Sequence, residues 1–400
     1  MLERTDPLRA TLAELLPDRP FTIDFWDGSR LASTNGAAGP TFTVRAPGAL
    51  QHALRAPGQL GVGRAYASGL LDVDDLDAAV DLLGSWQPPA LDRAAQARLA
   101  LAALRSAGLN RPPQVPAAEL RPRGRRHSVE RDGRSVRHHY EVSNDFFRLF
   151  LDESMTYSCA LWSRGAQTLE EAQQAKLDLV CDKLEIGDGD RVLDVGCGWG
   201  SFALHAARRG ASVVGITLAP SQADLARERA RDAGLADRID IRVQDYRALA
   251  GETFDKVVSI GMVEHVGANQ IDAYALALAA ALRPGGRLLN HGIARLRHGD
   301  PEAGPFSERY VFPDAAPLHL SRIQTAMEAA GLETDHVEGL RMDYARTLGE
   351  WARRFDEHID EAVRIGGEER ARVWRLYLRT ARRGFESGFM SVYQVRCRRP

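Results

Sequence analysis

The stretch that most constrains the fold is RVLDVGCGWGSF, residues 191–202. Its first half is a short apolar run with β-branched residues that ends at Gly196, which predicts a buried strand followed by a tight turn. Gly196, Gly198 and Gly200 let the backbone pass close to a ligand, and the residues from Ser201 onward predict a helix. A strand, a glycine turn and a helix in this order form a cradle for a nucleotide-sized ligand. The alternative interpretation is a strand-turn-helix corner that binds no ligand.

Asp194, just before the first glycine, narrows the choice of ligand. The spacing G-x-G-x-G differs from the dinucleotide pattern G-x-G-x-x-G, and a carboxylate facing the turn accepts from an amine but repels a pyrophosphate. Residues 213–219, at the end of the next predicted strand, contain no Asp or Glu to hold ribose hydroxyls. This counts against NAD and leaves the ribose to Thr217, Gln222 or backbone groups. The pattern favours the amino-acid end of S-adenosylmethionine (SAM).

Composition excludes several other classes. The 52 basic and 54 acidic residues give a net charge of −2, so no overall field attracts nucleic acid, and none is predicted as a partner. The four cysteines show no C-x-x-C pairing, which argues against a zinc site and a disulfide framework. We therefore predict no metal and a cytoplasmic location. No apolar run approaches the roughly 18 residues that a membrane span requires.

Residues 1–110 predict a small α+β domain, with strands at 21–26 and 40–46 and helices at 49–56, 76–83 and 91–109. The glycine-rich stretch 59–71 lacks a preceding strand suited to phosphate binding, so it predicts a packing turn. A linker at 111–137 follows, rich in proline and arginine. Its arginines form either a solvated segment or a patch for anionic phosphate head groups.

Residues 138–400 predict the catalytic domain. Strands and helices alternate along it, which predicts an α/β fold with a mostly parallel sheet that a late strand joins antiparallel. The seven expected strands are 191–195, 212–217, 238–243, 254–260, 287–293, 331–339 and 390–397, with a helical insert at 344–385.

Ligands of open α/β sheets bind at the carboxyl ends of the strands. This rule brings Glu264, His265 and His291 to one edge of the sheet. Asp245 either accepts from an adenine amine or caps a helix, and Tyr246 either offers a ring face or belongs to the core.

The aromatic stretch 138–162 predicts a helix that Asn144 caps and that continues through Leu151. Its apolar face suits either the core or the wall of an apolar substrate tunnel. Periodicity alone does not decide between the two.

Eight stretches, in this order, resemble the cyclopropane-fatty-acyl-phospholipid synthases and their mycolic-acid relatives. They are HYEVSNDFF, YSCALW, VLDVGCGWG, GITLAPSQ, QDYR, VSIGMVEHVG, LRPGGRLLNHGI and DYARTLGEW. The resemblance runs from about Arg137 to Cys397 and extends more loosely over the first 110 residues, a lipid-associated domain in the phospholipid-acting members. It implies the Rossmann-like fold of SAM-dependent methyltransferases.

The resemblance also implies a set of site residues. SAM would contact Tyr157, Ser158, Asp194, Gly196, Gly198, Gly200, Thr217, Gln222, Asp245 and Tyr246. A bicarbonate ion would be held by Cys159, Glu264, His291, Ile293 and Tyr344.

The implied reaction transfers a methylene group from SAM to the cis double bond of an unsaturated phospholipid acyl chain, giving a cyclopropane ring through a carbocation that bicarbonate deprotonates. One alternative is the same transfer ending in a methylene branch, and another is a lipid-binding protein without catalysis. The expected location is the cytoplasmic face of an anionic membrane. The sequence is compatible with a homodimer but does not settle the oligomeric state.

One departure from the family concerns the loop at residues 312–317. It reads FPDAAP, shorter than the family's F-P-x-G-x-L-P and without its glycine. The shape of the acyl entrance, and with it the accepted double-bond position, is left open.

Overall fold

The computed structural model describes residues 4–36, 39–108, 113–120, 124, 131, 143–249, 251–299 and 304–400. The chain divides into two compact units. The first comprises Met1–Arg121, Gly304–Val311 and Ala362–Arg383, and the second comprises Pro122–Ala303, Phe312–Glu361 and Gly384–Pro400. Two segments from within the predicted catalytic domain, 138–400, therefore group with the N-terminal residues.

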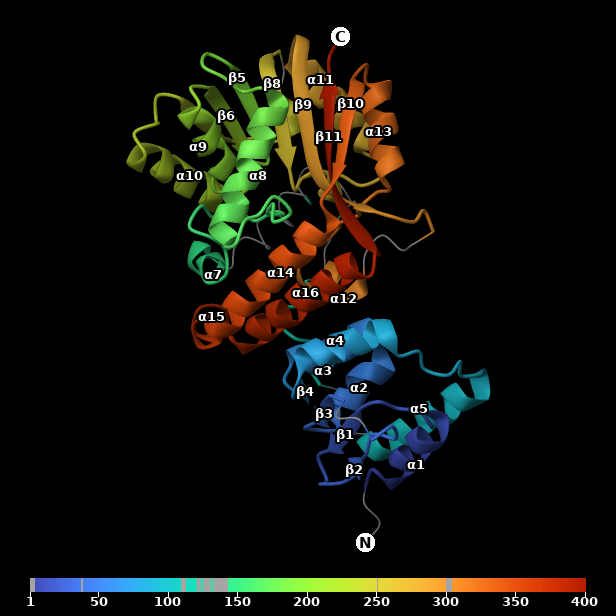
Figure 1. The fold of residues 1–400 in the computed structure, drawn as a ribbon. Coiled ribbons are helices and arrows are strands. Elements are labelled where there is room, and N and C mark those ends of the chain that lie inside the picture. The colour runs from blue at the N-terminus through green and yellow to red at the C-terminus, as the bar shows by residue number, and fades with distance from the viewer. Residues whose placement is uncertain are drawn as a thin grey trace. The chain divides into compact units, whose positions relative to one another are not determined.

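The first unit is built on a four-stranded sheet in the order β2-β1-β3-β4, in which only β1 and β3 are parallel. Its strands are β1 (Thr22–Phe25), β2 (Arg30–Leu31), β3 (Thr41–Val44) and β4 (Leu71–Val73). Its helices are α1 (Asp6–Leu15), α2 (Gly48–Arg55), α3 (Gln59–Ala67), α4 (Leu76–Ser85), α5 (Arg93–Ala107) and α12 (Pro305–Tyr310), together with most of α16 (Glu368–Glu386). Figure 1 traces these elements along the chain.

The predicted packing turn at 59–71 is wrong, because residues Gln59–Ala67 form the helix α3. Its glycines serve close packing. A Cβ at Gly61 would lie 2.3 Å from the carbonyl oxygen of Ala56, and one at Gly63 would lie 2.2 Å from a ring carbon of Phe306. Glycine is therefore needed where α2 and α12 approach this helix.

A buried ion pair joins α3 to Glu119, in the first part of the predicted linker. The guanidinium of Arg64 donates to both oxygens of Glu119 at 2.6 and 2.7 Å, and the hydroxyl of Tyr310 donates to the same carboxylate at 3.1 Å. Burial is the largest single effect and would raise the pKa of Glu119. The hydrogen bonds and charge of Arg64, with the hydrogen bond from Tyr310 and the charge of Arg309, together outweigh it, so the pKa lies below its usual value.

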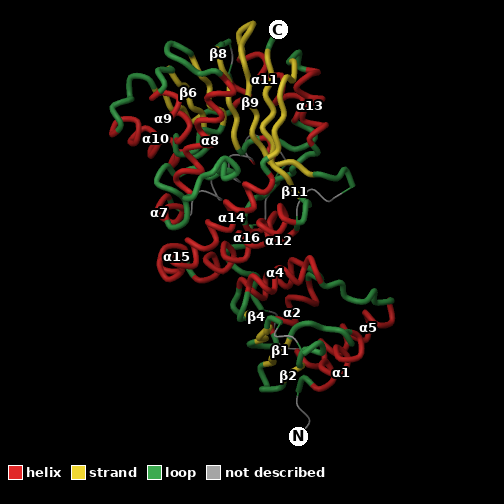
Figure 2. The backbone as a smooth tube through the Cα atoms, in the orientation of Figure 1, coloured by secondary structure: helices red, strands yellow, loops and turns green. Residues whose placement is uncertain are grey.

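The second unit contains a seven-stranded sheet in the order β10-β11-β9-β8-β5-β6-β7, drawn yellow in Figure 2. Its strands are β5 (Arg191–Val195), β6 (Ser212–Thr217), β7 (Ile239–Val243), β8 (Phe254–Ile260), β9 (Leu282–Arg295), β10 (Glu333–Gly339) and β11 (Met390–Arg398). Its helices are α7 (Asn144–Arg148), α8 (Leu169–Leu184), α9 (Ser201–Arg208), α10 (Pro220–Asp232), α11 (Ile271–Ala281), α13 (Leu320–Ala329) and α14 (Arg341–Glu357), with short 3₁₀ turns η1 (Tyr246–Ala248) and η2 (Val263–His265). The helix α15 (Ile359–Gly366) crosses the boundary between the units. The predicted α/β class and seven-stranded, mostly parallel sheet are confirmed.

Consecutive strand residues pack into opposite helical layers. Val192 and Val213 face α8, α9 and α10, whereas Leu193 and Val214 face α11 and α13. Both neighbours are buried, as expected of central strands in a sheet covered on two sides. The result is a three-layer core, with the two helical layers visible on the faces of the sheet in Figure 1.

The C-terminal strand β11 lies between β9 and β10 and is antiparallel to both. This confirms that a late strand joins the sheet antiparallel. It also places the last residues of the chain beside the strand that carries His291.

The described residues include neither a membrane-spanning helix nor a metal-binding cluster. No helix among them is long and apolar enough to cross a membrane. Nor do three or more of their His, Cys, Asp and Glu side chains gather in a group that could hold a metal ion.

Replacing Arg64 with methionine should destabilise the first unit strongly. The substitution leaves the fully buried Glu119 carboxylate without its cation, and such a loss costs about 3–5 kcal/mol of unfolding free energy. The matched control is Arg98→Met, which breaks an exposed pair with Glu14 and should cost less than about 1 kcal/mol. Urea unfolding of the two variants measures both values, and equal losses would contradict the assigned importance of the buried pair.

Candidate active site

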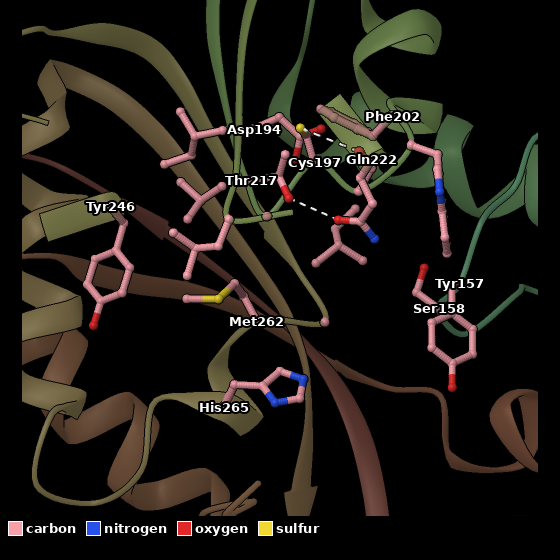
Figure 3. Close-up of a pocket in the computed structure, with 18 of the residues that line it drawn as sticks. Tyr157, Ser158, Asp194, Cys197, Phe202, Thr217, Gln222, Tyr246, Met262 and His265 are labelled. Atoms are coloured by element: carbon pink, nitrogen blue, oxygen red, sulfur yellow. Dashed lines mark hydrogen bonds between the residues drawn. The ribbon is translucent and has the colours of Figure 1, made fainter. Parts of the chain in front are cut away.

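A pocket with a volume of about 180 Å³ opens at the carboxyl ends of the parallel strands of the second unit. The residues that follow β5, β6, β7 and β8 line it, as the edge rule predicts. The lining includes all the predicted SAM-contacting residues except Gly200. In Figure 3, Tyr157 and Tyr246 lie on opposite sides of this pocket.

The glycine turn after β5 is held against β6 by its backbone. The amides of Gly196 and Cys197 both donate to the carbonyl oxygen of Ile216, at 2.9 and 3.0 Å. Gly196 has a φ of +81°, and a Cβ there would lie 2.9 Å from Cγ of Met262. The turn therefore depends on glycine for its conformation and for its close approach to the loop after β8.

Gly200 has a different role from the one predicted. It also has a φ of +81°, but its Cβ would lie 3.0 Å from Cβ of Ala226 on α10. Because Gly200 is not part of the pocket lining, the structure places it at a helix contact.

Asp194 and Lys176 are fully buried charged groups in the pocket wall. Burial raises the pKa of Asp194 to about 7, against the opposing effect of Lys176. Burial likewise lowers the pKa of Lys176 to about 8, although Asp152, Cys159 and Asp194 favour its charged form. Oδ2 of Asp194 makes no hydrogen bond with a described residue, so it is suited to accept from a ligand amine.

Sequence analysis missed Lys176. Its Nζ donates to Oγ of Ser158 at 2.9 Å, which links α8 to the loop that carries Tyr157. A signal was present: Gln173, Lys176, Leu177 and Val180 repeat at the spacing of one helix face, and all four are buried. A lysine on an otherwise mainly apolar face indicates a buried cation.

Thr217 and Gln222 meet at the end of β6. Oγ1 of Thr217 donates to Oε1 of Gln222 at 2.9 Å, the hydrogen bond drawn between them in Figure 3. Both side chains line the pocket. Asp245 caps η1 and pairs with the guanidinium of Arg247 at 2.7 Å. The capping alternative is therefore observed. Asp245 also lines the pocket.

The aromatic stretch before β5 forms part of the core. Phe146, Phe147 and Phe150 are completely buried, and Phe147 contacts Tyr157 edge-on with ring centroids 5.5 Å apart. The helix is capped by Ser143, whose hydroxyl accepts from the amide of Phe146, and not by Asn144 as predicted. Asn144 instead accepts from the indole of Trp199 at 2.7 Å.

Glu264 lies in the turn after β8 and points its carboxylate at β9. The backbone amides of Glu264 and Ile293 donate to this carboxylate, but burial dominates and raises its pKa to about 7. A Cβ at Gly292 would lie 2.2 Å from Val263 and 3.2 Å from Oε2 of Glu264. Only glycine at this position allows the turn to approach the strand.

The other predicted bicarbonate residues are linked to β9 either directly or through β11. Leu340 connects them: its carbonyl accepts from Sγ of Cys159 at 3.7 Å and from the amide of Tyr344 at 3.1 Å. Its amide donates to Val392 at 2.9 Å, and Val392 pairs with Ile293 across β11 and β9. The five residues thus belong to one connected group, which we call the β9 cluster: Cys159, Glu264, His291, Ile293 and Tyr344.

Two polar atoms of the β9 cluster are buried without a hydrogen bond to a described residue: Nε2 of His291 and Oε2 of Glu264. Cys159 is fully buried, and burial raises its pKa well above the usual value. Its thiol is therefore no activated nucleophile. The residues of the β9 cluster lie outside the lining of the pocket described above.

The loop at 312–317 closes one side of the pocket despite its lack of glycine. Asp314 lines the pocket and has a φ of +65°, a conformation that glycine adopts more easily. The guanidinium of Arg131 donates two hydrogen bonds of 2.6 Å to the carboxylate of Asp314. Sequence analysis did not single out this pair, because its members lie 183 residues apart.

Comparison with known proteins agrees with this geometry. Residues 127–395 match the family model of mycolic acid cyclopropane synthetase. A probable fatty acid methyltransferase of Mycobacterium tuberculosis is 38% identical over 97% of this chain and 94% of its own. The cyclopropane-fatty-acyl-phospholipid synthase of Escherichia coli is 33% identical over 90% of this chain and 88% of its own.

Solved structures give the same result. A cyclopropane synthase of Mycobacterium tuberculosis superposes with a TM-score of 0.64 and 33% identity, over 66% of this chain and 98% of its own. A mycolic acid cyclopropane synthase complexed with SAH superposes with a TM-score of 0.63 and 32% identity, over the same shares of the two chains. The chain therefore belongs to the mycolic acid cyclopropane synthetase family and is a SAM-dependent methyltransferase.

Proposed function

We propose that this enzyme transfers a methylene group from SAM to the cis double bond of an unsaturated phospholipid acyl chain and closes a cyclopropane ring, through a carbocation that bound bicarbonate deprotonates. The observation that carries the proposal is the pair of buried polar atoms in the β9 cluster, on a chain that also has a pocket suited to SAM. The Escherichia coli relative supports the substrate class, since it is named as a phospholipid-acting synthase.

The pocket residues fit SAM. The free carboxylate oxygen of Asp194 suits its ammonium group, and Thr217 with Gln222 offers polar groups at the strand end that lacks an acid. Bound SAM supplies an electrophilic methyl group. Because an alkene is a weak nucleophile, the protein must hold it in line with that methyl group and keep water away.

The β9 cluster fits a small oxyanion such as bicarbonate. A carboxyl whose pKa is about 7 is partly protonated at neutral pH, so Glu264 can donate a hydrogen bond to an anion without full charge repulsion. Tyr344 adds a phenol and Cys159 a neutral thiol to the same cluster. Bicarbonate held there would supply a base beside the positive charge of the reacting acyl chain.

Aromatic side chains can keep this region dry. Tyr157 lies 5.2 Å from Trp351 and Tyr344 lies 6.0 Å from Trp351, measured between ring centroids. Trp351 is fully buried and so joins the wall of the pocket to the β9 cluster through one continuous aromatic contact. Such a wall excludes water, which would otherwise trap a carbocation.

A second candidate function is the same transfer from SAM to the alkene, but with a methylene-branched acyl chain as the product. The tuberculostearic acid methyltransferase of Mycobacterium tuberculosis favours it, with 33% identity over 97% of this chain. The two products differ only in which carbon loses the proton, so the position of the base relative to the acyl chain decides between them.

The substrate also implies a location. We propose that the enzyme works at the cytoplasmic face of an anionic membrane, with residues 1–110 as the lipid-associated domain. The arginine-rich linker, 111–137, lies outside the described residues apart from 113–120, Gly124 and Arg131. Assembly as a homodimer stays a prediction.

Incubation of the enzyme with SAM and a monounsaturated phospholipid should yield a cyclopropane lipid. Proton NMR of the recovered lipid should then show upfield ring protons, because ring protons are strongly shielded. An olefinic methylene signal would instead establish the branched product. Unchanged lipid would overturn the proposed function.

Glu264→Gln should reduce turnover by roughly 10²-fold or more and leave SAM binding nearly intact. Glu264 lies in the β9 cluster and outside the pocket lining, so its loss disturbs the oxyanion site alone. Calorimetry measures SAM affinity, and product formation measures turnover. Glu153→Gln, at an exposed position, controls for the loss of one charge. A parallel fall in SAM affinity would contradict this assignment.

The same Glu264→Gln variant should change how stability depends on pH. The folded pKa of Glu264 is about 7 and its ordinary value is 4.5, so the folded state holds the proton more tightly than the unfolded state. Wild-type stability from this group is full below about pH 4.5 and is lost as the pH rises to about 7. From pH 5 to pH 8 the variant should gain about 2.5 kcal/mol relative to wild type. Denaturant unfolding at the two pH values measures the gain, and an unchanged difference would refute it.

A further inference from the structure

A chain of hydrogen bonds crosses three neighbouring strands and ends at His291 of the β9 cluster. In the sheet, Glu338 of β10 is paired with Gln394 of β11, and Gln394 is paired with His291 of β9. Residues that lie directly opposite each other on paired strands point to the same face. Their side chains therefore form one row.

Lys183 of α8 lies against this row and completes it. Its Nζ donates to Oε2 of Glu338 and, at 2.6 Å, to Oε1 of Gln394. Nε2 of Gln394 then lies 3.0 Å from Nδ1 of His291. Gln394 and His291 are fully buried, and the side chain of Lys183 is 9% exposed, so water competes little for the bonds that join these three residues.

The direction of every bond follows from the chemistry of lysine. A lysine ammonium can only donate, so the atom of Gln394 that faces it must be the amide oxygen. The amide nitrogen of Gln394 then faces His291 and can only donate. Nδ1 of His291 is therefore the acceptor, and the proton of the neutral ring lies on Nε2.

The opposite arrangement is disfavoured at both ends. A rotated amide would set its NH₂ group against the Lys183 ammonium. A histidine with a proton on Nδ1 would set a donor against the Gln394 NH₂ group. Burial and the positive charges of Lys176 and Lys183 lower the pKa of His291 to about 3, in agreement with a neutral ring.

We propose that Lys183 and Gln394 are positioning residues that hold His291 as the Nε2–H tautomer, so that it acts as a neutral hydrogen-bond donor and not as a base. Nε2 is the ring atom that makes no hydrogen bond with a described residue, which leaves its proton for a ligand. The assignment of the tautomer rests on the hydrogen bonds alone, and its catalytic consequence rests on the proposed function.

The consequence concerns charge. A neutral donor binds an oxyanion without adding a positive charge beside a sulfonium or a carbocation. A histidine cation in the same place would repel both. Because Nδ1 is occupied and Nε2 is protonated, proton abstraction falls to another group of the site.

The tautomer can be observed directly in the full-length enzyme labelled with ¹⁵N-histidine. Long-range proton–nitrogen NMR distinguishes protonated from bare ring nitrogens, and the spectrum of His291→Gln identifies the signals of His291. The expected wild-type pattern is a protonated Nε2 and a bare Nδ1. A protonated Nδ1 in the wild type would overturn the proposal.

Gln394→Glu reverses the bond to the ring with almost no change in shape. A carboxylate only accepts, so it keeps the bond from Lys183 but requires a proton on Nδ1 of His291. The expected spectrum has Nδ1 protonated. The matched control, Glu338→Gln, still offers Lys183 an acceptor and should keep the wild-type pattern. A bare Nδ1 in Gln394→Glu would refute the role of Gln394.

Lys183→Met provides a second test if Gln394→Glu does not fold. It removes the group that orients the amide, so both tautomers should appear, and an unmixed wild-type pattern would refute the role of Lys183. In folded Gln394→Glu, kcat should fall roughly 10²-fold with the KM for SAM unchanged. If the wild-type enzyme forms no lipid product at all, the proposed function is refuted. The NMR pattern would still decide the tautomer assignment.

Discussion

The pairing of β11 with β9 is the contact on which the candidate site most depends. It ties the last strand of the chain to the strand that carries His291 and Ile293, in a register that places Val392 opposite Ile293 and Gln394 opposite His291. Through Val392 and Leu340 it also fixes the start of α14, where Tyr344 lies. Residues from four separate parts of the sequence are thereby linked in one cluster, largely through backbone hydrogen bonds. A shift of β11 by one residue would turn Gln394 to the face of the sheet opposite His291.

Burial is the common cause of the site's electrostatics. It raises the pKa of Asp194 and Glu264 to about 7 and lowers that of Lys176 to about 8 and that of His291 to about 3. Each shift favours the neutral form of its group. Under the proposed function the site accommodates a sulfonium ion, an oxyanion and hydrocarbon. This arrangement would suit all three, because groups shifted toward their neutral forms add little fixed charge of their own.

Sequence analysis located most of the pocket but assigned two glycine-rich regions incompletely. The turn after β5 follows the prediction, since both Gly196 and Gly198 have positive φ and line the pocket. Gly200 and the glycines of α3 are required because a side chain there would clash with residues of other elements. The neighbouring residues in the sequence do not reveal these contacts. Lys176 was missed for a related reason: its value as a buried cation depends on Ser158 and Asp194, and these lie on other elements of the fold.

The sequence by itself determined the α/β class, the order of the strands along the chain, the glycine turn with Asp194, and the family resemblance that led to the β9 cluster. These features are encoded in short stretches, where period, turn residues and motif spacing act between near neighbours. Only the tertiary structure decided the insertion of β11 between β9 and β10, the grouping of 304–311 and 362–383 with the N-terminal unit, and the hydrogen-bond chain behind His291. His291 and Gln394 lie 103 residues apart in sequence, so their contact depends on strand pairing and burial, which arise only when the whole chain is folded.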